Sequence, residues 1–222
     1  MDLTVIGHNW KFLILQGLLG IGNFAGGTLR LAIPAIVLGF LLGIFIGLAR
    51  LAASPVVRGA ATAYVEFFRG VPLVMVIFWM WFVIPQVLRL PIPEYGVALT
   101  AFVIFEAAYF GEIVRAGVQS VPRGQVEAAR AVGLTGAQTM RVVVLPQALR
   151  NMVPALVTQM IVLFKDTSLA SIIGYVDLTK AAQIVNNREI KPFQLYLFIA
   201  VVYWLGAYSM SRVAQRMEKR SV

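Results

Sequence analysis

The sequence has no cysteine, a single histidine and few charged residues. Of its 222 residues, 13% are charged and 59% are hydrophobic. Without cysteine, the chain has no disulfide, no thiolate metal site and no cysteine nucleophile. The one histidine, His8, stands alone near the N-terminus, and no metal-ligand cluster or catalytic constellation is evident. The sequence therefore argues against a membrane-embedded enzyme, and we expect no metal site.

Long apolar runs dominate the sequence instead. A soluble domain of this size does not bury so much apolar surface, and a helix needs about 20 apolar residues to cross a bilayer. We expect an all-α polytopic membrane protein with about five transmembrane helices. The expected spans lie at about residues 29–50, 71–89, 96–118, 150–166 and 193–212 of a transmembrane domain covering residues 28–215.

The stretch before the first span allows two interpretations. Its apolar part, residues 12–21, is short and rich in glycine, and the start lacks the basic flank of a cleavable signal. We interpret residues 1–27 as a periplasmic or interfacial segment, with a sixth span as the alternative. Residues 216–222 form a basic tail.

The basic residues are distributed unevenly between the spans. Twelve of the nineteen follow the first, third and fifth expected spans: Arg50, Arg58, Arg69, Arg115, Arg123, Arg130, Arg141, Arg150, Arg212, Arg216, Lys219 and Arg220. The positive-inside rule then places the central loop and the C-terminus in the cytoplasm and the N-terminus outside. A basic patch at residues 180–191 lies on the opposite side.

The central loop, residues 120–147, has a helical pattern. Pro122 can open a first short helix that ends near Gly133, and Thr135 with Gln138 fits the capping box of a second. Pro146 is expected to mark where this helix gives way to the fourth span. Bare apolar residues in a cytoplasmic hairpin suggest a docking face; a self-packed hairpin on the membrane is the alternative. These residues are Val126, Val132, Leu134 and Val142.

Four ordered motifs resemble those of ATP-binding-cassette importer permeases, in the type I architecture. The loop motif comprises Glu127-Ala128-Ala129, Gly133 and Val143-Val144-Leu145-Pro146, and resembles the family's EAA loop, which usually has Ile at the position of Val143. The runs Phe68–Leu73, Glu112–Gly117 and Lys165–Leu169 resemble the polar amino-acid branch. The resemblance extends from Leu29 onward, and it is greatest to glutamate/aspartate permease subunits.

The resemblance implies partners and a mechanism. Two permease subunits, identical or homologous, form a pore in the bacterial inner membrane, and a periplasmic or surface-tethered binding protein delivers an amino acid. A cytoplasmic ATPase dimer binds the loops and drives alternating access. The chain has no Walker motif, so we expect it to be non-catalytic and to bind no cofactor, with ATP and Mg held by the ATPase. The expected coupling residues are Glu127, Ala128, Ala129, Gly133, Val143, Leu145 and Pro146.

Ionisable residues inside a span are costly and need an explanation. From Arg150 to Lys165 a helix rises about 22 Å, less than the hydrocarbon core of about 30 Å. Lys165 and Asp166 therefore fall inside the membrane, followed by the hydroxyls of Thr167 and Ser168. A helix interrupted here is tolerable beside a water-filled cavity that binds an amino acid. The alternative is that Lys165 snorkels outward and pairs with Asp166.

Polar residues at mid-span complete the candidate substrate path. Glu106 and Tyr109 share a face of the third span, and Gln159 lies in the fourth. Glu106 either holds the substrate ammonium or bonds to a neighbouring helix. Glu112 and Arg115, three residues apart near the inner surface, fit a structural ion pair better than substrate ligands.

A glycine stripe marks the first span. Gly39, Gly43 and Gly47 recur every four residues, and this spacing favours a close helix interface. Chance recurrence in a glycine-rich helix is the alternative.

For the substrate we predict an acidic amino acid, glutamate or aspartate, because the resemblance is greatest there and Lys165 suits an acidic side chain. Glutamine, arginine and histidine are the alternatives within the family. A stand-alone secondary transporter is the alternative outside it, and this would need no ATPase.

Overall fold

The computed structural model describes residues 4–22, 26–89 and 91–221, which form helices and loops without a strand. The first part contains α1 (Thr4–Trp10), the π-helical η1 (Lys11–Leu18), α2 (Thr28–Ala49), α3 (Pro55–Gly70) and α4 (Leu73–Leu88). The centre contains α5 (Glu94–Gln119), α6 (Arg123–Ala131), α7 (Gly136–Thr139), η2 (Met140–Val144) and α8 (Leu145–Asp166). The chain continues through η3 (Thr167–Ile173), α9 (Leu178–Glu189) and α10 (Pro192–Ser221). The expected all-α class is confirmed.

Four helical stretches are long and apolar enough to cross a membrane. They are Thr28–Ala49, Glu94–Gln119, Gly136–Ile173 and Pro192–Arg216. They overlap the first, third, fourth and fifth expected spans, and the fourth is much longer than the expected residues 150–166. Pro34 and Pro154 lie inside α2 and α8 without ending either helix. Membrane helices tolerate such prolines because neighbouring groups satisfy the freed carbonyls.

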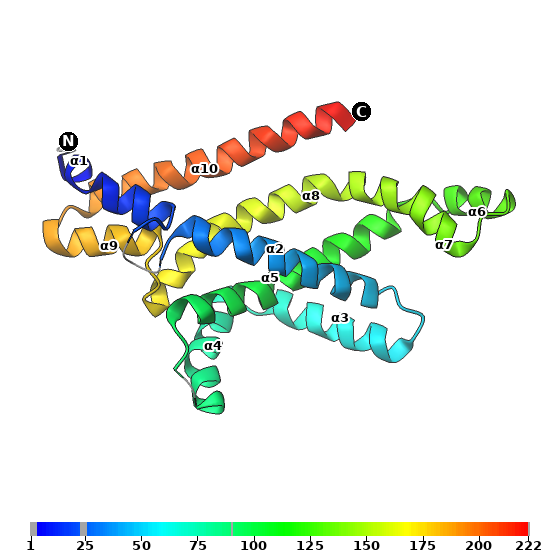
Figure 1. Cartoon of the computed structure of the whole chain (residues 1–222), viewed down its shortest axis with the longest axis horizontal. Helices are drawn as coiled ribbons and strands as arrows, with labels where there is room; N and C mark the ends of the chain where they lie inside the picture. The colour runs from blue at the N-terminus through cyan, green and yellow to red at the C-terminus, as the bar shows by residue number, and fades with distance from the viewer. Residues whose placement is uncertain (1–3, 23–25, 90, 222) are drawn as a thin grey trace.

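The second expected span, residues 71–89, corresponds to α4, but this helix forms only part of a bent pair. α4 has 16 residues and is the second arm of a pair with α3, bent by 103°. The break falls at Val71 and Pro72, both in extended conformation, because proline disfavours a helical conformation in the preceding residue. Figure 1 shows α4 projecting away from the other helices. Arg69 therefore lies within the bent pair, not in a connecting loop.

α5 is the central helix. It is the most buried of the four candidate spans and packs against α2, α3, α4 and α8. The glycine stripe of α2 faces it: a Cβ atom on Gly47 would stand 2.6 Å from the carbonyl oxygen of Gly111, and one on Gly43 would stand 2.6 Å from the Cβ of Phe110. The stripe is thus a helix interface, and its partner is α5 of the same chain.

The two ends of the molecule differ. α6 and α7 lie at one end, which we call the loop end, and α9 lies at the other, beside the N-terminal helix (Figure 1). α10 runs from the α9 end back toward the loop end (Figure 1). At the α9 end, Leu13, Leu178 and Leu195 join one apolar core. The N-terminal helix is thus packed on α9 and α10, and its expected interfacial position stays a prediction.

Candidate functional site

The central loop folds into two short helices with a bend between them. The chain turns at Gly133, whose φ of +88° is in the left-handed region that glycine adopts without strain. The backbone N–H of Gln138 donates to Thr135 Oγ1 at 3.3 Å, and the Thr135 N–H donates to Gln138 Oε1 at 2.8 Å. The predicted bend and capping box are both confirmed.

Pro146 lies where the second short helix gives way to the fourth span, as predicted: α8 begins at Leu145 with Pro146 in its first turn, although no break separates the two helices. The π-helical turn η2 follows α7 and leads directly into α8, and the helical stretch continues from Gly136 to Ile173. Proline lacks an N–H, and its ring crowds the carbonyl four residues earlier. A π-helical turn widens the helix just before Pro146 and accommodates both effects. The loop is therefore continuous with α8.

One face of the loop is anchored, and another is exposed. Val121, Val144 and Ala148 are buried in a core at the loop end. By contrast, Val132 is 79% exposed and Val142 is 64% exposed. Of the expected coupling residues, Ala129 is buried and Val143 half-buried; Glu127, Ala128, Gly133, Leu145 and Pro146 are exposed. Bare apolar side chains on an anchored loop form a surface suited to docking.

A second group of polar residues lies midway along α5 and α8. The side chain of Glu106 is fully buried, and its Oε2 accepts a hydrogen bond of 2.8 Å from Gln159 Nε2. Its other oxygen, Oε1, is buried without a hydrogen-bond partner. A buried unpartnered oxygen is costly. The bond to Gln159 is a contact with a neighbouring helix, and Oε1 keeps capacity for a ligand, so both predicted roles remain open.

Tyr109, on α5, lies against a basic side chain from another helix. Its ring lies under the guanidinium of Arg69, 5.6 Å from the ring centroid, from the end of α3. Glu106 lies three residues earlier on α5, roughly one helical turn away. Sequence reasoning missed Arg69 as part of this group because it was assigned to a loop. The signal was Gly70-Val71-Pro72, a helix break that can turn one apolar segment into a bent span.

α8 ends close to this group, as expected. The α-helix stops at Asp166 and tightens into the 3₁₀-helical η3. Thr167 is buried, and its Oγ1 donates a 2.8 Å hydrogen bond to the Phe164 carbonyl. Asp166 and Ser168 are half-buried, and Lys165 is exposed. The structure thus joins Glu106 to Gln159 by a hydrogen bond and places Tyr109 against Arg69, while Asp166 lies seven residues beyond Gln159 at the end of α8.

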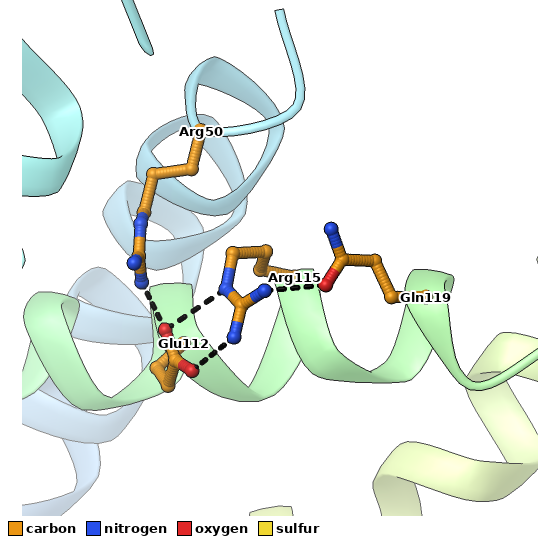
Figure 2. A network of polar contacts seen from close by, with 4 residues as sticks. All are labelled: Arg50, Glu112, Arg115 and Gln119. Atoms are coloured by element: carbon orange, nitrogen blue, oxygen red, sulfur yellow. Dashed lines mark hydrogen bonds and ion pairs between the residues drawn. The ribbon is translucent and has the colours of Figure 1, made fainter. Parts of the chain in front are cut away.

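A third polar group sits where α5 approaches the loop. Arg115 Nη2 contacts Glu112 Oε1 at 2.5 Å, and Arg115 Nε donates to Glu112 Oε2 at 3.1 Å. Arg50, at the end of α2, binds the same carboxylate, and Arg115 also reaches Gln119, as Figure 2 shows. The expected partners Glu112 and Arg115 are therefore paired, and Arg50 is an addition that sequence reasoning missed.

The fold and these polar groups define a polytopic membrane protein in which an exposed loop is continuous with a helix that is hydrogen-bonded to a buried glutamate. Comparison with known proteins gives the family. The model of the family described as "binding-protein-dependent transport system inner membrane component" matches residues 35–222. The chain belongs to this family, and the resemblance to importer permeases is confirmed.

Individual relatives span almost the whole chain. The glutamate/aspartate import permease protein GltK of Escherichia coli O6:H1 is 39% identical over 201 residues, covering 87% of this chain and 90% of that protein. The probable glutamine ABC transporter permease protein GlnP of Bacillus subtilis strain 168 is 41% identical over 197 residues, covering 87% and 89%. A solved amino acid ABC transporter with histidines has a TM-score of 0.90 at 32% identity, covering 99% of both chains.

Proposed function

We propose that this chain is the membrane-spanning subunit of an ATP-driven, binding-protein-dependent amino-acid importer. The observation that carries the proposal is the helical stretch Gly136–Ile173. It begins in the exposed loop, passes Gln159, which is hydrogen-bonded to the buried Glu106, and contains Asp166 further on. A continuous element of this kind converts a displacement of the loop into a displacement beside the polar interior. Alternating access follows if the two positions open opposite ends of the path.

The partners follow from the exposed surfaces. The apolar face of the loop around Val132 and Val142 suits a cleft on a cytoplasmic ATPase, of which a dimer serves two permease subunits. The ATPase binds ATP and Mg and hydrolyses the ATP. This chain is non-catalytic and binds no cofactor. The second permease subunit, identical or homologous, completes the pore. A periplasmic or surface-tethered binding protein supplies the substrate at the α9 end.

We propose that the loop end faces the cytoplasm and the N-terminus lies outside the bacterial inner membrane. The basic residues after α5 support this orientation through the positive-inside rule. Arg69 no longer counts toward it, because it lies within the bent pair of α3 and α4. The basic residues of the last helix, Arg212 and Arg216, still do.

The substrate path is proposed to run beside α5 and α8. Glu106, with its unpartnered oxygen, and Asp166 supply negative charge for the ammonium group of an amino acid. Arg69 and Lys165 supply positive charge for carboxylates. The path residues are Glu106, Tyr109, Gln159, Lys165, Asp166, Thr167 and Ser168, to which the structure adds Arg69.

We propose acidic amino acids as the substrates. Two basic side chains near the path, Arg69 and Lys165, suit a second carboxylate, and a glutamate/aspartate permease is among the similar proteins. Glutamine is the second candidate, favoured by the comparable identity to a glutamine permease. Arginine and histidine follow. Uptake of a labelled amino-acid panel by the reconstituted complex distinguishes these candidates.

The loop is the part of the proposal that distinguishes it from a stand-alone secondary transporter. Glu127→Lys and Gly133→Asp, both on the exposed loop, should abolish uptake while the permease remains in the membrane at normal abundance. Gly124→Ala is the matched control, because a Cβ atom there meets no neighbouring heavy atom within 4 Å. Normal uptake in both loop variants would remove the ATPase-coupling role.

A further inference from the structure

The contact of Arg50 with Glu112 joins two helices at the loop end. Glu112 accepts from Arg50 at Oε2 and from Arg115 at both oxygens, so one carboxylate is held by two guanidinium groups. Arg50 and Glu112 are 62 residues apart in sequence. In Figure 2, Arg50 reaches across from α2 while Glu112, Arg115 and Gln119 follow one another along α5.

The contact lies at the end of a tight apolar interface. Gly43 and Gly47 allow α2 to approach α5 closely enough that a Cβ atom on either would stand 2.6 Å from an atom of α5. Arg50 comes three residues after Gly47, roughly one helical turn further on. α2 is therefore held to α5 by packing along its length and by an ion pair at its loop end.

The loop joins the two spanning helices just beyond this point. Asn151 of α8 donates from Nδ2 to Ser120 Oγ at 2.8 Å, so the end of α5 is bonded to the start of α8. A cavity of about 260 Å³ lies between the two helices, and Glu112, Gly117, Ser120 and Met152 are among its lining residues. A displacement of the loop thus acts on α8 and on the end of α5, and Arg50 is the polar contact that joins α2 to α5 at this end, beside the apolar packing.

Arg50 is bound through one nitrogen and leaves another idle. Its Nη1 contacts Glu112, whereas its Nε is buried with no hydrogen-bond partner. A buried donor without an acceptor is costly. This incomplete arrangement suits a contact that is remade when the helices move, more than a fixed structural bond.

We infer that Arg50 is a positioning residue for transport, which acts through Glu112 to make α2 move together with α5 when the loop is displaced. The inference rests on the proposed function, because it assumes that an ATPase moves the loop. The side chains of Arg50 and Glu112 are 12% and 23% exposed, and Arg115 still holds Glu112 when Arg50 is replaced, so we expect losing the contact to alter coupling more than folding.

The test compares substrate moved with ATP hydrolysed. Arg50→Gln is reconstituted into vesicles with the ATPase and binding protein, and uptake of labelled glutamate or glutamine is measured beside phosphate release. Arg58→Gln is the matched control, since Arg58 is exposed and donates to the Ala52 carbonyl outside this network. We expect Arg50→Gln to assemble and hydrolyse ATP while uptake per ATP falls about 2- to 30-fold, the range for residues that carry coupling. Arg50→Lys, which keeps the positive charge, should restore part of the uptake per ATP.

Three results overturn the inference: unchanged uptake per ATP in Arg50→Gln, equal losses of uptake and ATP hydrolysis, or no rescue by Arg50→Lys. If Arg50→Gln fails to reach the membrane, Glu112→Gln provides the same measurement, since its amide retains one acceptor oxygen. Failure of the unmodified complex to take up either amino acid counts against the proposed function instead, so the two failures are distinguishable.

Discussion

Two glutamates on α5, six residues apart, are treated differently by the fold. Glu106 is fully buried, with one neutral donor on Oε2 and no hydrogen-bond partner for Oε1. Glu112 is partly exposed, and both of its oxygens are occupied by Arg50 and Arg115. The same residue type on the same helix is therefore incompletely bonded at mid-membrane and fully bonded near the loop.

This difference separates binding from coupling. A buried carboxylate with a free oxygen has capacity to bind a cation, and desolvation strengthens that attraction. A carboxylate already held by two arginines has little left for a substrate, and its contacts instead connect helices. The predictions below test this division, from the largest expected effect to the smallest.

The largest effect should come from Glu106→Gln. Glutamine keeps the shape and the bond to Gln159 but removes the negative charge proposed to hold the substrate ammonium. A hydrogen bond to a charged group is worth about 1.5–3 kcal/mol, so we expect kcat/KM for uptake to fall roughly 10- to 150-fold. Glu94→Gln, at the exposed start of α5, is the control. Unchanged transport kinetics in Glu106→Gln would end the binding role.

Asp177 adds a third acid to the comparison, buried like Glu106 but hydrogen-bonded like Glu112. It lies outside the spans and caps α9 by accepting from the N–H groups of Thr179 and Lys180, and it also accepts from the Tyr203 hydroxyl. Burial raises the pKa of Asp177 to about 6, although these donors lower it. Full hydrogen bonding therefore does not offset the loss of water around this carboxyl.

The raised pKa gives the pH dependence a definite sign. The folded state binds the Asp177 proton more tightly than the unfolded state does. The contribution of the protonated carboxyl to the free energy of unfolding is therefore complete below about pH 4 and is lost as pH rises through about 6. The loss amounts to about 2–3 kcal/mol. Asp177→Asn keeps a capping side chain and should flatten the change in thermal midpoint between pH 4.5 and 7.5. Glu189→Gln is the control, and an equally steep profile in Asp177→Asn contradicts the assignment.

The packing of α2 against α5 also differs between the two glutamates. A Cβ atom on Gly47 would stand 2.6 Å from the carbonyl oxygen of Gly111, next to Glu112, whereas one on Gly39 would stand 3.2 Å from the Cβ of Glu106. Overpacking against a rigid backbone costs about 1–3 kcal/mol. Gly47→Ala should therefore lower the thermal midpoint in detergent more than Gly39→Ala does. The reverse order would show that the helices are not held as closely at the loop end.

The smallest effect should be that of Glu112→Gln on folding. Partly exposed ion pairs contribute about 0–1 kcal/mol, so the thermal midpoint should shift little even though the variant is expected to disturb coupling. Thermal unfolding of the purified permease measures this directly. A large drop in midpoint would mean that the network holds the fold together, and the proposed division between the two glutamates would be lost.

Local signals in the sequence predicted the loop well. Gly133 and the Thr135–Gln138 capping box act within a few residues of chain, so their structures follow from local chemistry. The interface on the glycine stripe of α2 was also predictable, because the spacing alone places the three residues on one face. Pro146 marked the start of the spanning helix α8, and the π-helical turn before it relieves the steric conflict, so the loop and α8 are continuous.

Contacts made through the tertiary fold escaped sequence reasoning. Arg69 was placed in a loop because the 103° bend between α3 and α4 is a property of two helices together. Arg50 reaches Glu112 across 62 residues, and no periodicity connects them. The full burial of Glu106 depends on Gly39 and Gln159, which come from two other helices. The hydrogen bonds and the burial of the polar groups on α5 therefore could not be predicted from the sequence and were found only in the structure.

The most direct test of the central claim is ATP-dependent uptake by the reconstituted complex. The chain is placed in vesicles with its partner ATPase and binding protein, and labelled glutamate, aspartate, glutamine, arginine and histidine are supplied in turn. The account predicts uptake of at least one of these amino acids that requires both ATP and the ATPase. Equal uptake without the ATPase, driven by an ion gradient, would contradict it.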